Sequence, residues 1–282
     1  MQNLEKIYDF HNHVVYGVDD GSDSLETSIK MLQQAADQGV TNVVCTTHQF
    51  EPITPTYPSK RQENIVERFN ILKKSIKDRK IPIELSLGSE IMFFGDMKKY
   101  LSLPYFSIND NKKYVMIEFR LIGPPINYVD TFYDLVLKGY KPILAHPERI
   151  NGLYNDKANL IKLLKMGVLF QINTGSILGL LGTRAKIISK KYLENNWIHL
   201  LGSDAHSLNF RRGFSMQKGI EYISKYYPNV NLREILETNP KTVINGEHVE
   251  VDISNINFEV KSTPNYIDKL INKIFKKNKK LL

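Results

Sequence analysis

The sequence of 282 residues contains a single cysteine, Cys45, so it forms no internal disulfide bond and is typical of a reducing compartment. It also lacks any apolar run near the ~20 residues that cross a bilayer. Among the longest is the segment Ile-Leu-Gly-Leu-Leu-Gly at 177–182. The first residues, Met-Gln-Asn-Leu-Glu-Lys, show no apolar segment of the kind found in secretory signals. These absences predict a cytoplasmic globular protein.

Several common catalytic and nucleotide-binding motifs are missing as well. No Gly-x-Gly-x-x-Gly motif follows the first predicted strand, and neither a phosphate-binding Gly-x-x-x-x-Gly-Lys loop nor a Gly-x-Ser-x-Gly nucleophile motif is found. The residue six positions after Cys45 is Glu51, whereas cysteine-dependent tyrosine phosphatases need an arginine there to hold phosphate. We therefore interpret Cys45 as a core residue.

What the chain does contain is an ordinary balance of residues, 42% hydrophobic and 24% charged, which suffices for a sizeable core. Its net charge of +8 favours anionic partners. Much of this excess lies in the last fifteen residues, at Lys269, Lys273, Lys276, Lys277, Lys279 and Lys280. The charge therefore says little about the centre of the molecule.

Short apolar, β-branched segments alternate with longer amphipathic ones along most of the chain. The predicted strands are Lys6–His11, Asn42–Thr47, Ile83–Gly88, Tyr114–Phe119, Pro142–Ala145, Leu169–Asn173 and Ile198–Gly202. The predicted helices are Leu25–Gln38, Asn64–Lys80, Asn127–Lys138, Asp156–Lys165 and Arg184–Asn195. This alternation predicts an α/β protein built from parallel βα units. We favour a distorted (β/α)7 TIM-like barrel over residues 1–250, followed by a basic extension over 251–282.

Nine residues of metal-ligating type lie at the ends of these predicted strands or in the loops that follow them. They are His11, His13, Asp20, His48, Glu90, Glu118, His146, Asp204 and His206. The C-terminal ends of barrel strands meet at one rim, where the active sites of barrel enzymes are built. So many ionisable groups in one place would suffer desolvation and like-charge repulsion unless cations neutralised them. The pattern therefore predicts a metal centre, whereas His199 and His248 are interpreted as structural histidines.

The ligand types limit both the metal and the chemistry. Mixed nitrogen and oxygen donors without a thiolate suit Mn²⁺, Fe²⁺ or Zn²⁺, and nine donors imply two or three ions. Such centres catalyse hydrolytic displacements, typically at phosphorus. Arg149, Arg211 and Arg212 lie close to predicted ligands in the sequence and can bind phosphate oxygens in a bidentate manner. Surface salt bridges are the alternative interpretation of these arginines.

In combination, the motifs resemble a known superfamily. They are His-x-His at 11–13, Asp-Asp-Gly at 19–21, Thr-x-His at 46–48, Glu90, Ile-Glu-Phe at 117–119, Ala-His-x-Glu-Arg at 145–149 and Ser-Asp-x-His at 203–206. Over residues 7–245 the chain resembles the polymerase-and-histidinol-phosphatase (PHP) superfamily. Within it, the chain is similar to the manganese-dependent protein-tyrosine phosphatases of bacterial capsule and exopolysaccharide operons.

The resemblance implies three divalent ions, with Mn²⁺ favoured over Fe²⁺ and Zn²⁺. It implies a first ion at His11, His13, Glu90 and Asp204, a second at Glu90, Glu118 and His146, and a third at Asp20, His48 and His206. Asp20 is the implied ligand of the Asp-Asp pair, while Asp19 would shape the loop. Arg149 and Arg211 would be the catalytic, phosphoryl-binding residues, and the adjacent Arg212 leaves that last alignment ambiguous by one position.

The implied substrate is phosphotyrosine in the tail of a cognate bacterial tyrosine autokinase, attacked by a metal-bridging hydroxide. Three alternatives remain open from the sequence. They are a small-molecule phosphatase of the histidinol-phosphate type, a phosphodiesterase or nuclease, and a metal-binding scaffold without activity. No nucleic acid partner is expected, because the aromatic and basic residues do not interleave as they do in single-strand channels.

The end of the chain departs from the family pattern. In the segment Tyr-Ile-Asp-Lys-Leu-Ile-Asn-Lys-Ile-Phe, apolar residues recur at helical spacing among lysines, which predicts a basic amphipathic helix. The sequence leaves three interpretations open: contact with an anionic membrane surface or acidic partner, packing on the barrel, and a frayed end without fixed structure. The sequence leaves the oligomeric state open.

Overall fold

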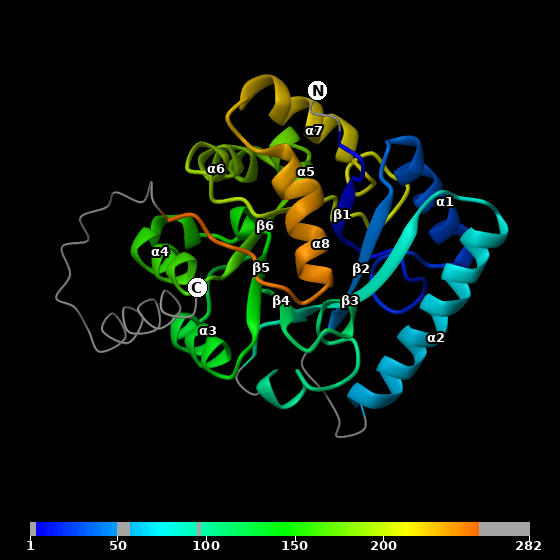
Figure 1. The fold of residues 1–282 in the computed structure, drawn as a ribbon, viewed down its shortest axis with the longest axis horizontal. Helices are drawn as coiled ribbons and strands as arrows, with labels where there is room; N and C mark the ends of the chain where they lie inside the picture. Colours follow the sequence, from blue (N-terminus) through cyan, green and yellow to red (C-terminus); the bar gives the residue numbers. More distant parts are fainter. Residues whose placement is uncertain (1–3, 50–56, 95–96, 254–282) are drawn as a thin grey trace.

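The computed structural model of the chain describes residues 4–49, 57–94 and 97–253, with residues 57–61 described by their backbone alone. Seven parallel strands form one sheet in the order of the sequence (Figure 1). They are β1 (Tyr8–Asn12), β2 (Asn42–Gln49), β3 (Glu84–Met92), β4 (Tyr114–Glu118), β5 (Lys141–Ala145), β6 (Leu169–Asn173) and β7 (Leu200–Gly202). The prediction of parallel βα units is confirmed.

The sheet curls until its first and last strands meet. His13 N donates to Ala205 O at 2.8 Å, and Asp204 N donates to His11 O at 2.7 Å. Gly202 makes this approach possible, because a Cβ atom at that position would lie 2.5 Å from the Cβ of His11. The predicted distorted seven-stranded barrel is therefore confirmed, closed by backbone contacts just beyond the ends of β1 and β7.

Helices surround the barrel on its outside (Figure 1). They are α1 (Leu25–Asp37), α2 (Tyr57–Asp78), α3 (Tyr128–Leu137), α4 (Lys157–Lys165), α5 (Thr174–Leu178), α6 (Thr183–Glu194) and α7 (Met216–Tyr226). Ser24 caps α1 by accepting a hydrogen bond from Thr27 N at 3.2 Å, as its sequence signature predicts. All five predicted helices are present, although α2 begins well before the predicted Asn64. Helices α5 and α7 were not predicted from the sequence.

A further helix, α8 (Asn239–Ile244), follows a π-helical turn at Glu234–Thr238 and closes the N-terminal end of the barrel. In Figure 1 it crosses in front of the strands, drawn in orange. Asn239 Nδ2 donates to His199 O at 3.1 Å, which ties α8 to the segment before β7. Short 3-10 turns occur at Met97–Lys99, Ile108–Asp110, Pro147–Arg149 and Leu153–Asn155.

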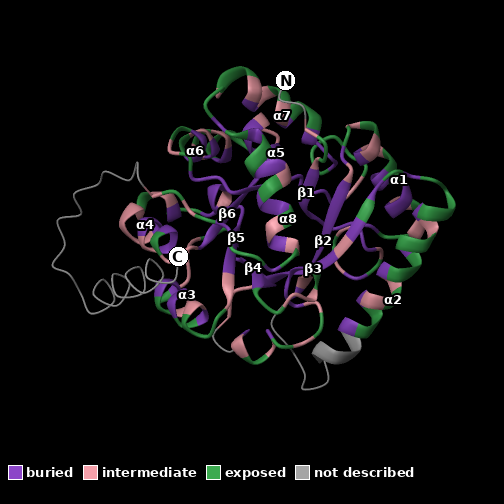
Figure 2. Ribbon diagram, viewed as in Figure 1, coloured by how far each residue is buried: buried purple, intermediate pink, exposed green. Residues whose placement is uncertain are grey.

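The strands are coloured mostly as buried residues in Figure 2, and the buried apolar side chains form two clusters. The larger apolar cluster lies between the strands and the outer helices. The smaller one fills the barrel interior and consists of Phe10, Val44, Ile108, Tyr114, Met116, Ile143, Ala145, Leu169, Leu200, Val243 and Val249. Side chains alternate between the two faces of a strand, so Val44 and His48 on β2 both point into the barrel, as do Leu169 and Asn173 on β6. The interior is thus apolar near α8 and polar at the opposite end.

The chain beyond the barrel is described only in part. Val251 and Ile253 pack against the outer apolar cluster. The amphipathic helix predicted near the end of the chain lies outside the described residues. Within the described ranges, no helix combines the length and hydropathy that crossing a membrane requires.

Candidate metal centre

All nine predicted ligands meet at the C-terminal end of the barrel. Their potential ligand atoms form four groups, in each of which the atoms lie within 4.8 Å of one another. The groups are His11, His13 and Asp204; His11, Glu90 and His146; His48, Glu90 and Glu118; and His13, Asp20, His48 and His206. Within the described ranges, these four groups include every predicted ligand and no other residue.

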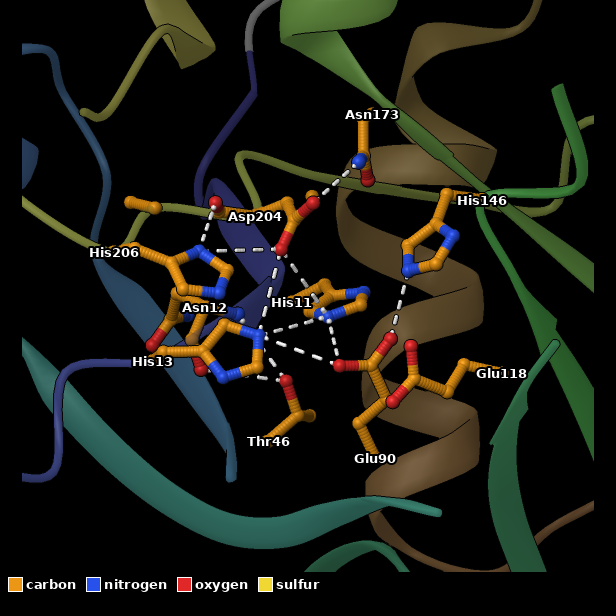
Figure 3. Close-up of polar contacts among 12 residues, drawn as sticks. His11, Asn12, His13, Thr46, Glu90, Glu118, His146, Asn173, Asp204 and His206 are labelled. Carbon is orange, nitrogen blue, oxygen red and sulfur yellow. Dashed lines mark hydrogen bonds and ion pairs between the residues drawn. The ribbon is translucent and has the colours of Figure 1, made fainter. Parts of the chain in front are cut away.

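Glu90 occupies the middle of the cluster (Figure 3). It lies inside β3, which runs beyond the predicted end at Gly88, and its side chain is fully buried. Glu90 Oε1 is 2.7 Å from His146 Nε2, and Glu90 Oε2 is 3.2 Å from His11 Nε2 and 3.0 Å from His48 Nδ1. One carboxylate therefore contacts histidines from three different strand ends, as a bridging ligand must.

Asp20 marks the open side of the cluster. Its carboxylate oxygen Oδ1 lies 3.4 Å from His206 Nε2 and 3.5 Å from His48 Nε2. The Asp20 side chain is 58% exposed, whereas the side chains of His11, His13 and Glu90 are 0% exposed. A substrate can therefore approach the cluster near Asp20.

Asp19, next to Asp20, faces inward and holds the cluster in place. Its Oδ2 lies 2.9 Å from His13 Nδ1 and also accepts a hydrogen bond from His48 N at 3.1 Å, while Oδ1 accepts from Gly21 N at 3.0 Å. A proton on Nδ1 of His13 leaves the lone pair of Nε2 directed into the cluster. Asp19 is therefore a positioning residue that sets the His13 tautomer.

Histidines and carboxylates shift one another's ionisation strongly. Burial alone would lower the pKa of His13, but the Asp19 carboxylate raises it well above its usual value. Burial also opposes the charged form of His48, yet Glu90 raises its pKa to about 10. Burial would raise the pKa of Glu90, but His11 and His48 hold it well below its usual range. The cluster thus contains buried anionic carboxylates that require positive charge nearby.

The residues present fit divalent cations. Glu90 Oε2 and His206 Nε2 are buried, and although charged groups lie close to both atoms, none of these contacts among the described residues has hydrogen-bond geometry. Buried polar atoms without a hydrogen bond are costly unless something else satisfies them. All donors in the cluster are imidazole nitrogens or carboxylate oxygens, which suits Mn²⁺, Fe²⁺ or Zn²⁺.

Two predicted ligands have an unusual backbone conformation. His146 has φ 32° and Asp204 has φ 55°, both in the left-handed region that non-glycine residues seldom adopt. His146 directly follows β5 and begins the turn Pro147–Arg149, and Asp204 follows β7. Such conformations persist only where the surrounding contacts impose them, and they gather at functional sites.

Two arginines contact the cluster. Arg149 Nη1 donates to Asp204 Oδ2 at 2.5 Å, and Arg212 Nη2 donates to Asp20 Oδ2 at 3.3 Å. Arg211 is exposed and forms no ion pair with the described residues. Of the two adjacent arginines, Arg212 is therefore the one that contacts a predicted ligand.

The remaining histidines and the cysteine lie elsewhere. His199 Nδ1 accepts a hydrogen bond from Phe170 N at 3.0 Å, and burial lowers its pKa to about 4. His248 is exposed after α8. Cys45 is buried in the outer apolar cluster, and burial raises the pKa of its thiol far above the usual value. The hydrogen bond of His199 and the burial of Cys45 agree with the structural roles expected for them, whereas the role of His248 stays a prediction.

The sequence matches a known family over most of its length. Residues 7–245 match the family described as capsular polysaccharide synthesis, CpsB/CapC. The chain belongs to the CpsB/CapC family. The family match covers β1 to β7 and all nine predicted ligands.

Individual family relatives are similar over most of their length. The chain is 32% identical over 220 residues to the tyrosine-protein phosphatase YwqE of Bacillus subtilis, covering 78% of this chain and 84% of that protein. It is 30% identical over 259 residues to the putative tyrosine-protein phosphatase CapC of Staphylococcus aureus, covering 90% and 97%.

Solved structures agree with the fold. A crystal structure of the metal-dependent tyrosine phosphatases YwqE from Bacillus subtilis and CpsB from Streptococcus pneumoniae matches with a TM-score of 0.77 at 30% identity, covering 87% of this chain and 97% of that one. A histidinol phosphate phosphatase from Lactococcus lactis matches with a TM-score of 0.52 at 15% identity, covering 82% and 95%, and shows the fold alone.

This CpsB/CapC member also contains supporting residues that sequence reasoning missed. Gln171 Oε1 lies 2.8 Å from His11 Nδ1, and Gln171 Nε2 donates to Asn173 Oδ1 at 2.9 Å. Asn173 Nδ2 in turn donates to Asp204 Oδ2 at 2.8 Å (Figure 3). The available signal was two polar residues at alternate positions of the apolar strand β6, where a purely structural strand would place apolar ones.

Proposed function

We propose that this protein is a divalent-metal-dependent protein-tyrosine phosphatase that dephosphorylates a bacterial tyrosine autokinase and so regulates capsular or exopolysaccharide synthesis. The observation that carries the proposal is the convergence of five histidines and four carboxylates at one barrel rim, with two arginine contacts. Membership of the CpsB/CapC family and similarity to YwqE and CapC support it.

We assign the nine ligands to three ions. His11, His13, Glu90 and Asp204 hold the first, Glu90, Glu118 and His146 the second, and Asp20, His48 and His206 the third. The four ligand groups support this division, although His13 also groups with the third set and His48 with Glu90 and Glu118. We propose Mn²⁺ as the metal, with Fe²⁺ and Zn²⁺ compatible with the same donors. When bound, such ions supply Lewis acidity and an activated water.

The protein's own groups orient the phosphoryl group. Arg149 is held by Asp204 and Arg212 by Asp20, so two guanidinium groups stand beside the ligands of different ions. Both arginines are partly exposed and have further N–H groups for the phosphoryl oxygens. The family resemblance implied Arg211, together with Arg149, as catalytic and phosphoryl-binding, and this role of Arg211 stays a prediction beside the alternative that Arg212 fills it. A tyrosine phenol, with a pKa of about 10, is a good leaving group, so the demand for a general acid is small.

A phosphatase assay with defined metal content tests the proposal. The purified protein should release phosphate from a phosphotyrosyl peptide, lose this activity with a chelator and recover it when Mn²⁺ is added. The double variant His11→Ala/His13→Ala should lose activity by several orders of magnitude, while His248→Ala, at an exposed histidine, serves as the matched control.

Two results would overturn the proposal. The first is full activity of the His11→Ala/His13→Ala protein on the phosphotyrosyl peptide. The second is turnover of histidinol phosphate by the metal-loaded protein without turnover of the peptide, which would place it among small-molecule phosphatases.

A further inference from the structure

The loop between β4 and α3 exposes apolar side chains beside the metal centre. It begins directly after Glu118 and Phe119 and carries Leu121 (45% exposed), Ile122 (82% exposed) and Ile126 (89% exposed). Single exposed aliphatic residues are ordinary on protein surfaces, but three within six residues form a local apolar surface that suits binding. We call this segment, with its three exposed aliphatic side chains, the β4–α3 apolar loop.

The apolar loop is connected to the wall of the site that carries Arg149. Asn151 N donates to Leu121 O at 2.9 Å. Arg184 on α6 donates to Arg149 O at 2.6 Å and to Asn151 Oδ1 at 3.2 Å. The loop, the segment around Arg149 and the start of α6 therefore form one hydrogen-bonded wall, with the phosphate-binding candidate at one edge and aliphatic side chains at the other.

Several features hold the loop in a defined shape. Gly123 N donates to Arg120 O at 3.2 Å, and Pro124 and Pro125 restrict the backbone that follows. At its base, the buried ring of Phe119 packs edge-on against Tyr128 with centroids 5.4 Å apart. A fixed loop presents its apolar groups with little loss of conformational entropy when a ligand binds.

We infer that the β4–α3 apolar loop binds an aliphatic or aromatic side chain that neighbours the phosphotyrosine in the peptide substrate. This inference rests on the proposed phosphatase function and adds a sequence preference to it. Position argues for a peptide occupant, because the loop continues the wall that leads from Glu118 to Arg149. Charge agrees, since exposed Arg120 lies beside the apolar side chains and favours an anionic phosphopeptide.

The test compares three substrates with one double variant. The substrates are a phosphotyrosyl peptide with leucines on both sides of the phosphotyrosine, the same peptide with serines there, and p-nitrophenyl phosphate. We expect the wild-type protein to prefer the leucine peptide by about tenfold in kcat/KM, mainly through KM, since burying one aliphatic side chain has an effect of this order. Ile122→Ser/Ile126→Ser should abolish this preference.

A matched control separates the loop from a general loss of surface hydrophobicity. Leu137 at the end of α3 and Ile187 on α6 are 58% and 53% exposed, and neither lies in the loop. The double variant Leu137→Ser/Ile187→Ser should keep the preference for the leucine peptide. Circular dichroism and thermal melting of all three proteins check that each is folded.

The possible results are distinguishable. Equal kcat/KM of the wild-type protein for the two peptides, or an unchanged preference in Ile122→Ser/Ile126→Ser, would overturn the inference while leaving the phosphatase function standing. An equal loss on p-nitrophenyl phosphate would also overturn it, since the loop would then shape the catalytic centre itself. A change of oligomeric state in the variant with no change in peptide preference would assign the loop to contact between copies. Failure of the wild-type metal-loaded protein on every phosphotyrosyl peptide would instead refute the proposed function.

Discussion

Replacing Asp19 with asparagine should weaken metal binding although Asp19 is not a proposed ligand. The Asp19 carboxylate faces three donors: His13 Nδ1, His48 N and Gly21 N. An asparagine can keep the acceptor for Gly21 N, but its NH2 group would then face two donors. His13 must respond by carrying its proton on Nε2, where a metal needs the lone pair.

The size of the effect follows from the contacts. Loss of a partner that orients a metal-ligating histidine typically lowers metal affinity 10- to 100-fold, or about 1.4 to 2.7 kcal/mol. The substitution should also lower the free energy of unfolding. Burial would raise the pKa of Asp19, but His13 and two backbone N–H groups lower it to about 2. Relative to the usual value of 3.8, that shift corresponds to about 2 kcal/mol of stability above pH 4.

Two measurements address these two costs. Competition with a chelator gives the apparent Mn²⁺ dissociation constant of the wild-type protein, Asp19→Asn and the control Asp23→Asn, whose side chain lies exposed in the same loop. Urea unfolding of the metal-free proteins gives the stability difference. If Asp19→Asn bound Mn²⁺ within twofold of the wild-type protein, the tautomer argument would be refuted.

Three further predictions follow from other contacts. Gly202→Ala would bring a Cβ within 2.5 Å of His11 Cβ and 2.8 Å of His11 N, so its thermal midpoint and Mn²⁺ affinity should both fall; an unchanged midpoint in a melting experiment would contradict the close approach of β1 and β7. Arg212→Lys should lower kcat/KM for phosphotyrosyl peptide about tenfold and more than Arg211→Lys does, and the opposite order in steady-state assays would favour Arg211. Burial lowers the pKa of His199 to about 4, so the unfolded chain takes up a proton first as pH falls from 6.5. The contribution of His199 to stability should therefore be about 2 kcal/mol smaller at pH 5 than at pH 7.5. His13 and His48, whose pKa values are raised, act in the opposite direction, so the test is the difference between the wild-type protein and His199→Gln in denaturant unfolding at the two pH values. An equal pH dependence in both proteins would argue against a neutral buried His199.

The ends of the strands were the most predictable part of the molecule. His48, Glu118 and His146 could be placed together from sequence because parallel strands deliver their C-terminal ends to one rim regardless of loop details. The length of β3 was less predictable. Gly88 suggested a strand end, whereas β3 continues past it because its later residues pair with β2 as far as Ile91 and with β4 from Glu90 to Met92, so Glu90 lies within the strand.

The supporting contacts were not predictable for a different reason. In the sequence, nothing marks Gln171 on β6 as a neighbour of His11 on β1. The two side chains meet only because the sheet closes into a barrel and brings strands from its opposite ends together. The contact of Arg212, rather than Arg211, with Asp20 accompanies a turn in which His206 N and Ser207 N both donate to Arg212 O, and no sequence pattern specifies that turn. Helix α8 was missed because a π-helical turn precedes it and disturbs the 3.6-residue periodicity.

The seam between β1 and β7 has a consequence for how the chain stays folded. Ser203 Oγ and His11 O, at 3.5 Å, join positions 192 residues apart, and His11, His13 and Asp204 converge at the same seam. A cation shared by these three side chains would form a reversible cross-link between the first and last strands. The single cysteine of the protein cannot form an internal disulfide bond that would do the same covalently. Cross-links that close long loops restrict the unfolded chain most, so metal supply should govern resistance of the barrel to proteolysis as well as its activity.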